Sequence, residues 1–214
     1  MEILIRDARA TDAPFIAWVM QAAARSHLPK GVWDLAFPGP DGPRLEVLAS
    51  LATSERIHFC HWSRFRVLEV DGEPAAGLSA YENARYGMEH LRPAIAEVIS
   101  GLGWSRERML AVGQSTASFE AVGYPSPDAV WIVEWVATRP EFRGRGLIHH
   151  LLVDILERGR REEFMTAQIG YLLGNNPARN AYQKVGFKWL EDYQHPDFEA
   201  AFGTPGVARM QRPL

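Results

Sequence analysis

Two arginines and two glycines alternate in Arg143-Gly144-Arg145-Gly146, between an apolar run and an amphipathic stretch. Glycine lets a backbone approach a ligand closely, and guanidinium groups bind phosphate oxygens. If a helix begins directly after the loop, its first N–H groups and its dipole also favour an anion. The segment therefore indicates a phosphate site, although a tight strand-to-helix connection is the better interpretation of the loop taken alone.

Two common nucleotide-binding motifs do not match this loop. A P-loop continues into Gly-Lys-Ser/Thr, and the dinucleotide fingerprint has a third glycine; neither is found after Gly146. Both kinds of nucleotide site are therefore disfavoured.

A second motif follows the next apolar run, at the spacing Asn-x-x-Ala-x-x-x-Tyr-x-Lys-x-Gly-Phe. Its members are Asn175, Ala178, Tyr182, Lys184, Gly186 and Phe187. Together with the loop at 140–146, this motif resembles the GNAT superfamily of acyl-CoA-dependent N-acetyltransferases. The specific resemblance covers about a third of the chain, and its two motifs occur in the family's order.

The glycine loop departs from the family pattern Arg/Gln-x-x-Gly-x-Gly/Ala at one position. A register that starts at Arg143 places Ile148 where glycine or alanine is expected. A register that starts at Glu141 restores both glycines but puts an acid in the basic position. We prefer the Arg143 register, and we expect the Ile148 side chain to point into the core while its N–H faces the ligand.

The resemblance implies that acetyl-CoA is the cosubstrate and that backbone groups hold it. A strand edge can pair with the pantetheine amides as an added strand does, and a backbone N–H near Val136 is the implied oxyanion donor. The implied cofactor-binding residues are Val136, Ala137, Thr138, Arg143, Gly144, Arg145, Gly146, Leu147, Ile148, Asn175 and Asn180. Asn175 has a second interpretation, as the cap of the following helix.

Tyr182 and Glu134 are the candidate catalytic residues. Tyr182 occupies the family's tyrosine position and can protonate the leaving thiolate, because tyrosine is protonated at neutral pH. Glu134 is the one charged residue in the run 129–138, and an unpaired buried carboxylate is costly, which indicates a wet cleft or a function. Three alternatives stay open: a packing role for Tyr182, an ion pair or exposed strand face for Glu134, and a water chain in place of a base.

The resemblance implies an N-acetyltransferase that moves acetyl from acetyl-CoA to a primary amine by direct attack in a ternary complex. A non-catalytic acyl-CoA-binding module of the same fold is the alternative, which Ile148 favours and Tyr182 disfavours. Glu134, Glu82 and Asp128 suggest a cationic acceptor if they converge. We expect a small-molecule amine as partner, with no nucleic acid or membrane, and a monomer or homodimer.

The composition is that of an ordinary globular protein. The chain has 214 residues, 47% of them hydrophobic and 23% charged, which suits one domain over 1–214. A net charge of −3 argues against a nucleic-acid binder. Cys60 is the only cysteine, so an internal disulfide is impossible, and the sequence predicts a cytoplasmic protein without a signal peptide or membrane span.

Two clusters carry weaker signals. His58, Cys60 and His61 allow a metal site, but a loop with ordinary histidines is the preferred interpretation, because no second cluster completes a tetrahedral set. The segment 82–128 is expected to be a helical insertion before the central strand. Its aromatic residues fit either a substrate pocket or a small core of their own: Tyr86, Trp104, Phe119 and Tyr124.

Hydrophobic periodicity predicts an α/β (α+β) fold, a mixed and mostly antiparallel sheet with helices on both faces. The strands at 129–138 and 167–173 are joined by a helix, so they should be parallel neighbours with a right-handed crossover; the resemblance implies that they splay apart around a cleft. Thr11 is the expected first helix cap. The other expected strands are 3–6, 65–70, 74–81, one beginning at 187–191, and 207–211; the expected helices are 15–25, 44–53, 88–99, 105–112, 147–157 and 177–185; the expected loops are 29–43 and 197–206.

Overall fold

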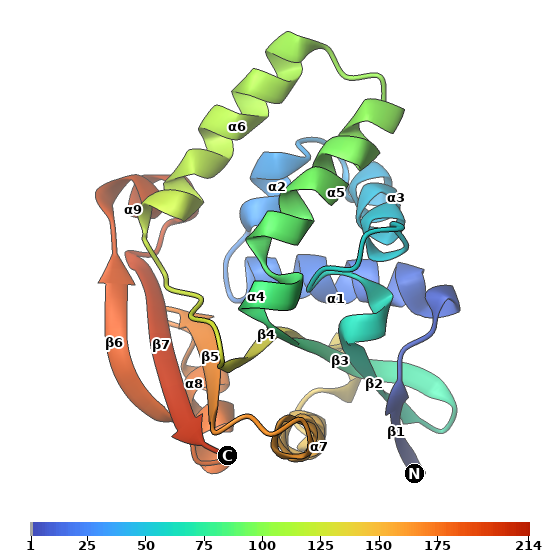
Figure 1. Ribbon diagram of the computed structural model, residues 1–214, viewed down its shortest axis with the longest axis vertical. Coiled ribbons are helices and arrows are strands. Elements are labelled where there is room, and N and C mark those ends of the chain that lie inside the picture. The colour runs from blue at the N-terminus through green and yellow to red at the C-terminus, as the bar shows by residue number, and fades with distance from the viewer. Residues whose placement is uncertain (1) are drawn as a thin grey trace.

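The computed structural model describes residues 2–214 and has a seven-stranded sheet in the order β1-β2-β3-β4-β5-β7-β6. Figure 1 shows that β5, β7 and β6 diverge in direction from the first four strands. The strands are β1 (Ile3–Asp7), β2 (Phe65–Val70), β3 (Glu73–Glu82), β4 (Trp131–Thr138), β5 (Thr166–Leu172), β6 (Lys188–Gln194) and β7 (Gly206–Pro213).

Only β4 and β5 pair in parallel; the other neighbouring strands of the described chain pair antiparallel. The expected mixed, mostly antiparallel sheet is therefore confirmed. The β4–β5 ladder runs from Trp131↔Ala167 to Val133↔Ile169 and stops there. The carboxyl-terminal halves of β4 and β5 are consequently separate, as the resemblance implies.

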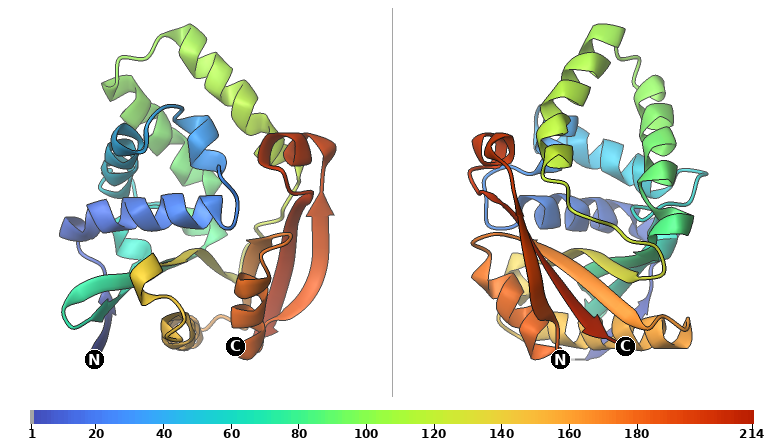
Figure 2. Two further views of the ribbon diagram at one scale, coloured as in Figure 1. Left: turned by 180° about the vertical axis from the view of Figure 1, so that it is seen from behind. Right: turned by 60° about the vertical axis from the view of Figure 1, so that its left-hand side comes forward.

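Helices cover both faces of the sheet (Figures 1 and 2). One face carries α1 (Ala13–Arg25), α2 (Val32–Ala36), α3 (Asp41–Ala52), α4 (Asn83–Tyr86) and α5 (Met88–Gly101), and the other carries α7 (Leu147–Arg161) and α8 (Asn176–Lys184). Within residues 2–214, no helix is long and apolar enough to cross a membrane.

The side chains of β4 alternate between two cores. Ile132 packs into the core beneath α1 and α3, whereas Trp131 and Val133 pack into the core against α7, because successive strand residues point to opposite faces. Trp131 also donates from Nε1 to the Ile155 carbonyl of α7 at 3.0 Å. This explains why the first half of β4 is apolar throughout.

The segment 82–128 forms an arch of helices that α6 (Arg106–Ala121) closes. In Figures 1 and 2, α5 climbs away from the sheet and α6 descends toward α9 (Pro196–Phe202). Phe119 near the end of α6 meets Phe198 and Phe202 of α9 at ring-centroid distances of 5.9 and 6.3 Å. The arch thus joins the α1–α3 side of the molecule to the β7–β6 side.

Strand β6 forms one edge of the sheet. It exposes Trp189 and Leu190, at 58% and 43% of their surface.

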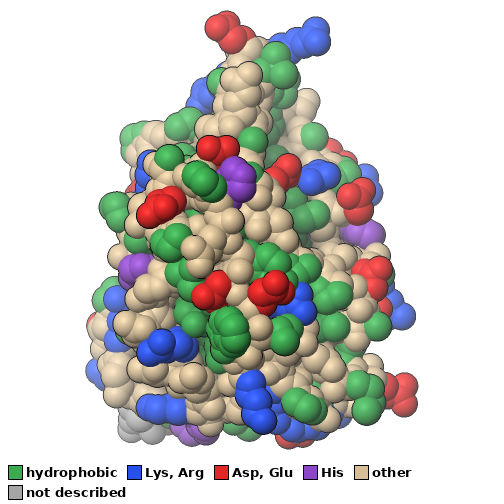
Figure 3. All heavy atoms as spheres, turned by 90° about the vertical axis from the view of Figure 1, so that its left-hand side faces the viewer, with side chains coloured by type: hydrophobic (Ala, Val, Ile, Leu, Met, Phe, Trp, Pro, Cys, Tyr) green, Lys and Arg blue, Asp and Glu red, His purple; other side chains and the backbone are tan. Residues whose placement is uncertain are grey.

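Figure 3 views the molecule from the left-hand side of Figure 1, where acidic and basic side chains are intermixed rather than gathered by sign. No continuous basic surface is visible from that side.

Some helix predictions were wrong. Thr11 lies in a short 3-10 turn, and Asp12 precedes α1; its carboxylate accepts from the Arg9 N–H at 2.7 Å and pairs with Arg6. The expected loop 29–43 contains α2, and the expected loop 197–206 contains most of α9. Local caps begin both helices: the Asp34 carboxylate accepts from the Gly31 N–H, and Pro196 opens α9. Tertiary contacts support them, since Asp34 also pairs with Arg25 and Phe198 is buried.

Candidate active site

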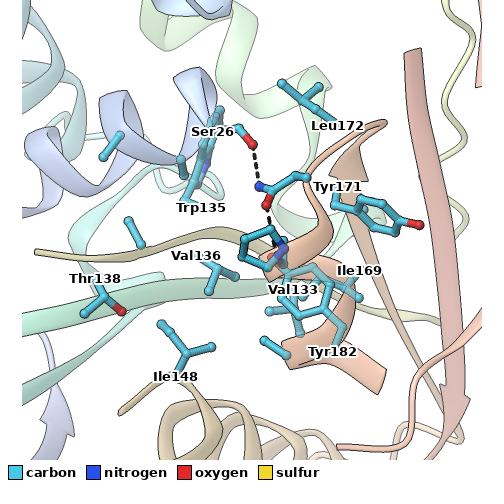
Figure 4. Close-up of a pocket in the computed structure, with 18 of the residues that line it drawn as sticks. Ser26, Val133, Trp135, Val136, Thr138, Ile148, Ile169, Tyr171, Leu172 and Tyr182 are labelled. Atoms are coloured by element: carbon cyan, nitrogen blue, oxygen red, sulfur yellow. Dashed lines mark hydrogen bonds between the residues drawn. The ribbon is translucent and has the colours of Figure 1, made fainter. Parts of the chain in front are cut away.

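A cleft of about 1040 Å³ opens where β4 and β5 separate. Its walls come from the end of α1, the second half of β4, the loop before α7, strand β5 and helix α8 (Figure 4). Every catalytic and cofactor-binding candidate named from the sequence lines this cleft. The two motifs, which lie about thirty residues apart in the chain, therefore meet at one site, consistent with a right-handed strand–helix–strand connection.

A bulge in β4 reshapes the floor of the cleft. Ser79 of β3 pairs with Glu134, but Gly77 pairs with Ala137, so the register shifts between them. Trp135 adopts a left-handed backbone with φ of 53°, which is uncommon for a bulky residue. A bulge bends a strand and re-aims its side chains. Beyond the bulge, the β4 edge that faces β5 has no partner in that strand.

Aromatic packing accompanies the strained backbone of the bulge. The Trp135 ring lies 5.4 Å from Trp33 and 6.0 Å from Phe59, between centroids. Trp33 belongs to α2, the helix that the sequence did not predict. Strain of this kind persists only where surrounding structure holds it, and it gathers at functional sites.

The glycine loop leads directly into α7. Gly144 and Gly146 have φ of 76° and 73°, and a Cβ on either would meet nothing within 4 Å. Arg143 donates to the Thr138 carbonyl at 3.2 Å and Arg145 to the Glu141 carbonyl at 3.0 Å. The first N–H groups of a helix lack partners within it. Open backbone, free N–H groups and two tethered cations make this end of the cleft suitable for a pyrophosphate.

Ile148 lies only partly as expected. Its side chain is half-buried and packs against the core that contains the buried residues of α7, but it also lines the cleft, as Figure 4 shows. The reason is helical geometry: Leu147 is the residue that α7 buries at this turn, and the next position points elsewhere.

Tyr182 lies on α8 with only 6% of its surface exposed, yet it lines the cleft. Its ring is 6.4 Å from those of Tyr171 and Phe187. Burial raises the pKa of the Tyr182 hydroxyl, and the nearby Glu134 carboxylate raises it further. The hydroxyl is therefore protonated at neutral pH and can donate.

Glu134 lies beside the bulge and is partly buried. Burial raises the pKa of its carboxyl to about 7, and the Trp135 N–H, which donates to it, opposes that rise. The negative charge of Glu134 contributes to the raised pKa of three tyrosine hydroxyls: Tyr81, Tyr124 and Tyr182. No cation among the described residues is close enough to lower its pKa, so the ion-pair interpretation is wrong.

Asn175 acts as a cap and a tether. Its Oδ1 accepts from the Ala178 N–H at 3.1 Å, and its Nδ2 donates to Ser26 at 2.5 Å, shown by dashed lines in Figure 4. The predicted capping role is confirmed, and the cap and the bond to Ser26 together occupy both ends of the amide. Asn180 lies further along α8, exposed at the cleft.

The acidic residues suggested for the acceptor do not converge. Glu82 pairs with Arg85 at 3.0 Å, and Asp128 accepts from Asn83 at 3.2 Å, and neither lines the cleft. Among the aromatic residues of 82–128, Phe119 and Tyr124 line the cleft, whereas Tyr86 and Trp104 lie elsewhere.

The sequence did not single out Trp135 or Gly170 as residues of the site. No local signal marks a tryptophan for a left-handed backbone. Gly170 does leave a signal, as a glycine inside a strand, which often marks close approach of another group. Here a Cβ on Gly170 would lie 2.8 Å from the Tyr124 hydroxyl, so the glycine makes room for that ring.

The histidine cluster forms local hydrogen bonds. His58 is buried; its Nδ1 accepts from the Cys60 N–H at 3.1 Å and its Nε2 lies 3.0 Å from the Ser54 hydroxyl. Over the described range 2–214, no three His, Cys, Asp or Glu side chains are grouped to hold a metal.

Comparison with known proteins identifies the family and the fold. A sequence model of the acetyltransferase (GNAT) family matches residues 34–187. An N-acetyltransferase from Staphylococcus aureus Mu50 is similar in structure, with a TM-score of 0.71 at 18% identity over 98% of this chain and 100% of that one. A polyamine N-acetyltransferase from Drosophila melanogaster has a TM-score of 0.56 at 14% identity over the whole of both chains.

An aminoglycoside acetyltransferase in complex with coenzyme A has a TM-score of 0.53 at 14% identity, over 99% of this chain and 95% of that one. At such identities, these structures share the fold with the present chain. No curated protein sequence matches it.

Proposed function

The chain belongs to the GNAT family of acetyltransferases, and from that premise we propose that it transfers an acetyl group from acetyl-CoA to a primary amine. The observation that carries the proposal is the meeting of Glu134 and Tyr182 in the cleft that opens between β4 and β5. One residue can accept a proton and the other can donate one, which is what attack by an amine and departure of a thiolate require.

Two parts of the cleft support the proposal that it binds acetyl-CoA. The Gly144–Gly146 loop offers free N–H groups and two arginines to a pyrophosphate. The unpaired edge of Val136, Ala137 and Thr138 offers backbone groups to the pantetheine amides, as a strand would. The Thr138 hydroxyl is buried without a partner among the described residues, as expected at a site that a ligand completes.

The attacking amine must be neutral. Glu134 takes its proton, and at a pKa of about 7 the carboxylate is ionised in a useful fraction of molecules at neutral pH. The amine nitrogen then forms a bond with the acetyl carbonyl carbon. A backbone N–H near Val136 stabilises the negative charge that develops on the carbonyl oxygen.

The bond from carbon to sulfur breaks last, and Tyr182 donates its proton to the departing thiolate. The new amide nitrogen loses its extra proton to solvent as that bond breaks. The proton that Glu134 received restores the tyrosine through solvent, so the net products from an ammonium acceptor are an amide, a free thiol and one proton. The high pKa of Tyr182 keeps the donor protonated until the thiolate forms.

A non-catalytic acyl-CoA-binding module remains the second candidate. Ile148 supports it, because a branched side chain lines the cleft where the family pattern has glycine or alanine. Such a protein would bind acetyl-CoA and release no thiol.

Thiol release from acetyl-CoA, measured across a panel of primary amines, separates the two functions. The enzyme releases thiol in proportion to the acetylated amine, which mass spectrometry identifies. Binding of acetyl-CoA with no release for any amine would support the binding module instead.

A further inference from the structure

The cleft is lined by fewer acidic side chains than basic ones. Glu134 is the one carboxylate among the described lining residues. The other ionisable lining side chains, tyrosines aside, are Arg143, Arg145 and Lys184, with His27, His149 and His150. An acceptor with one ammonium group finds one counter-charge, whereas a second ammonium meets only cationic or neutral groups.

Acidic residues outside the cleft do not correct this imbalance. Glu82 is held by Arg85, and Asp128 by Asn83, away from the lining. A polyamine or an aminoglycoside carries several ammonium groups, and recognition of each needs a carboxylate or a comparable acceptor. The single carboxylate of the cleft therefore favours an acceptor with one ammonium group over an acceptor with several.

Aromatic rings stand beside that single carboxylate. Tyr124 is close enough to Glu134 for the carboxylate to raise the pKa of its hydroxyl, after the larger effect of burial. Trp135 is the neighbour of Glu134 in β4, and Phe119 lines the same cleft. Flat apolar faces take up the body of an aromatic ligand and also attract a cation.

Other aromatic rings pack against Phe119 and Tyr124. The ring centroids lie 5.9 Å apart for Phe119 and Phe198, and 5.7 Å apart for Tyr124 and Tyr193. Gly170 lets Tyr124 lie directly on β5, since any Cβ would meet its hydroxyl at 2.8 Å. The aromatic walls are thus preorganised, and preorganisation lowers the entropic cost of binding.

We propose that the acceptor is a primary monoamine with an aromatic body, whose ammonium group pairs with Glu134 while its ring packs on Tyr124 and Phe119. This inference rests on the proposed acetyl transfer, because it assigns the amine that the same cleft receives. It excludes polyamines and aminoglycosides as good acceptors.

The test compares 2-phenylethylamine with butylamine, 1,4-diaminobutane and spermidine at saturating acetyl-CoA. We expect 2-phenylethylamine to have the highest kcat/KM, by at least about tenfold over butylamine, the scale on which an apolar pocket discriminates. The two polyamines should be weaker still. A higher kcat/KM for either polyamine would overturn the inference while leaving acetyl transfer intact.

A matched pair of variants tests the ring contact. Tyr124→Leu keeps an apolar side chain but removes the ring from the cleft, and should reduce the preference for 2-phenylethylamine over butylamine to about threefold or less. Tyr86→Leu makes the same change in the same inserted segment, outside the cleft beneath Arg64, and should keep the preference. Equal preferences in wild type and both variants would overturn the ring contact.

Amine binding, measured by thermal shift in the presence of CoA, distinguishes failure of the inference from failure of the proposed function. If no amine releases thiol but 2-phenylethylamine stabilises wild type and not Tyr124→Leu, acetyl transfer is wrong and the acceptor site stands. If 2-phenylethylamine neither reacts nor stabilises the protein while another amine does, the acceptor class is wrong. If no amine of the panel does either, both proposals fail.

Discussion

At the scale of single residues, the cleft raises the proton affinity of two side chains to different levels. Burial raises the pKa of Glu134 to about 7, where it can gain and lose a proton under ordinary conditions. Burial and the same carboxylate raise the pKa of Tyr182 above that of a free tyrosine. Separated proton affinities of this kind are typical of a base and an acid that act in one reaction.

Tyr182→Phe removes one hydroxyl and little volume, so the variant should fold. The thiolate would leave without a positioned proton donor, and we expect kcat to fall about a hundredfold. The KM for acetyl-CoA should change little, because the interaction belongs to the transition state. Full turnover in the variant would rule out the donor role, and a lost affinity for acetyl-CoA would make Tyr182 a binding residue.

Glu134→Gln tests the base through the dependence of rate on pH. The raised pKa means that Glu134 is protonated and idle below about pH 7, so the wild-type kcat/KM should rise as pH increases through that value. The groups that face it, Cys60, Tyr81, Tyr124 and Tyr182, all have raised pKa values and stay neutral there. The variant should lack this rise; an identical profile would assign the inflection to another group.

At the scale of elements, the site depends on two short irregularities, the β4 bulge and the glycine loop. The glycine loop could be predicted from the sequence, because alternating glycines and arginines between a strand and a helix indicate a tight turn with an anion site. The bulge could not, because φ of 53° at Trp135 comes with packing against Trp33 and Phe59, which are distant in sequence. The short helices α2 and α9 carry local signals, Asp34 three residues after Gly31 and Pro196 followed by Gly203, but the prolines and glycines around them favoured a loop.

Gly146→Glu places a side chain and a negative charge where the loop faces the cleft, so CoA binding should be lost. Gly203→Glu is the matched control: its φ of 79° resembles the 73° of Gly146, a Cβ at either meets nothing within 4 Å, and it lies outside the cleft. Both variants should lose similar stability, while calorimetric titration should detect CoA binding only in Gly203→Glu. Retained CoA binding in Gly146→Glu would reject the loop as the pyrophosphate site.

The contact between α7 and β4 predicts a stability effect. A Cβ on Gly159 would lie 2.7 Å from the Trp131 ring and 2.8 Å from Leu214, so Gly159→Ala should destabilise the protein by about 1–3 kcal/mol. Gly113→Ala, in open space within α6, should stabilise it by up to about 1 kcal/mol, because alanine favours a helix. Urea unfolding measures both; equal midpoints would contradict the close packing.

At the scale of the whole molecule, a sheet that separates along one line provides the cleft, and a helical arch joins the two sides. The parallel pair, its helix and the two motifs were predictable, since periodicity and spacing are local properties of the sequence. Which acidic side chains come together in the cleft was not predictable. Glu82 and Asp128 were candidates for binding a cationic acceptor together with Glu134, yet of the three only Glu134 lines the cleft. Which side chains meet depends on the completed fold.

The central claim is direct transfer from acetyl-CoA to an amine held in the same cleft. It is tested by rapid mixing of the protein with a few equivalents of acetyl-CoA, with and without 2-phenylethylamine, while thiol release is followed. We expect no thiol without the amine and continuous release with it. A burst of one thiol per protein without amine would indicate an acetylated enzyme, and no release with any primary amine would contradict catalysis.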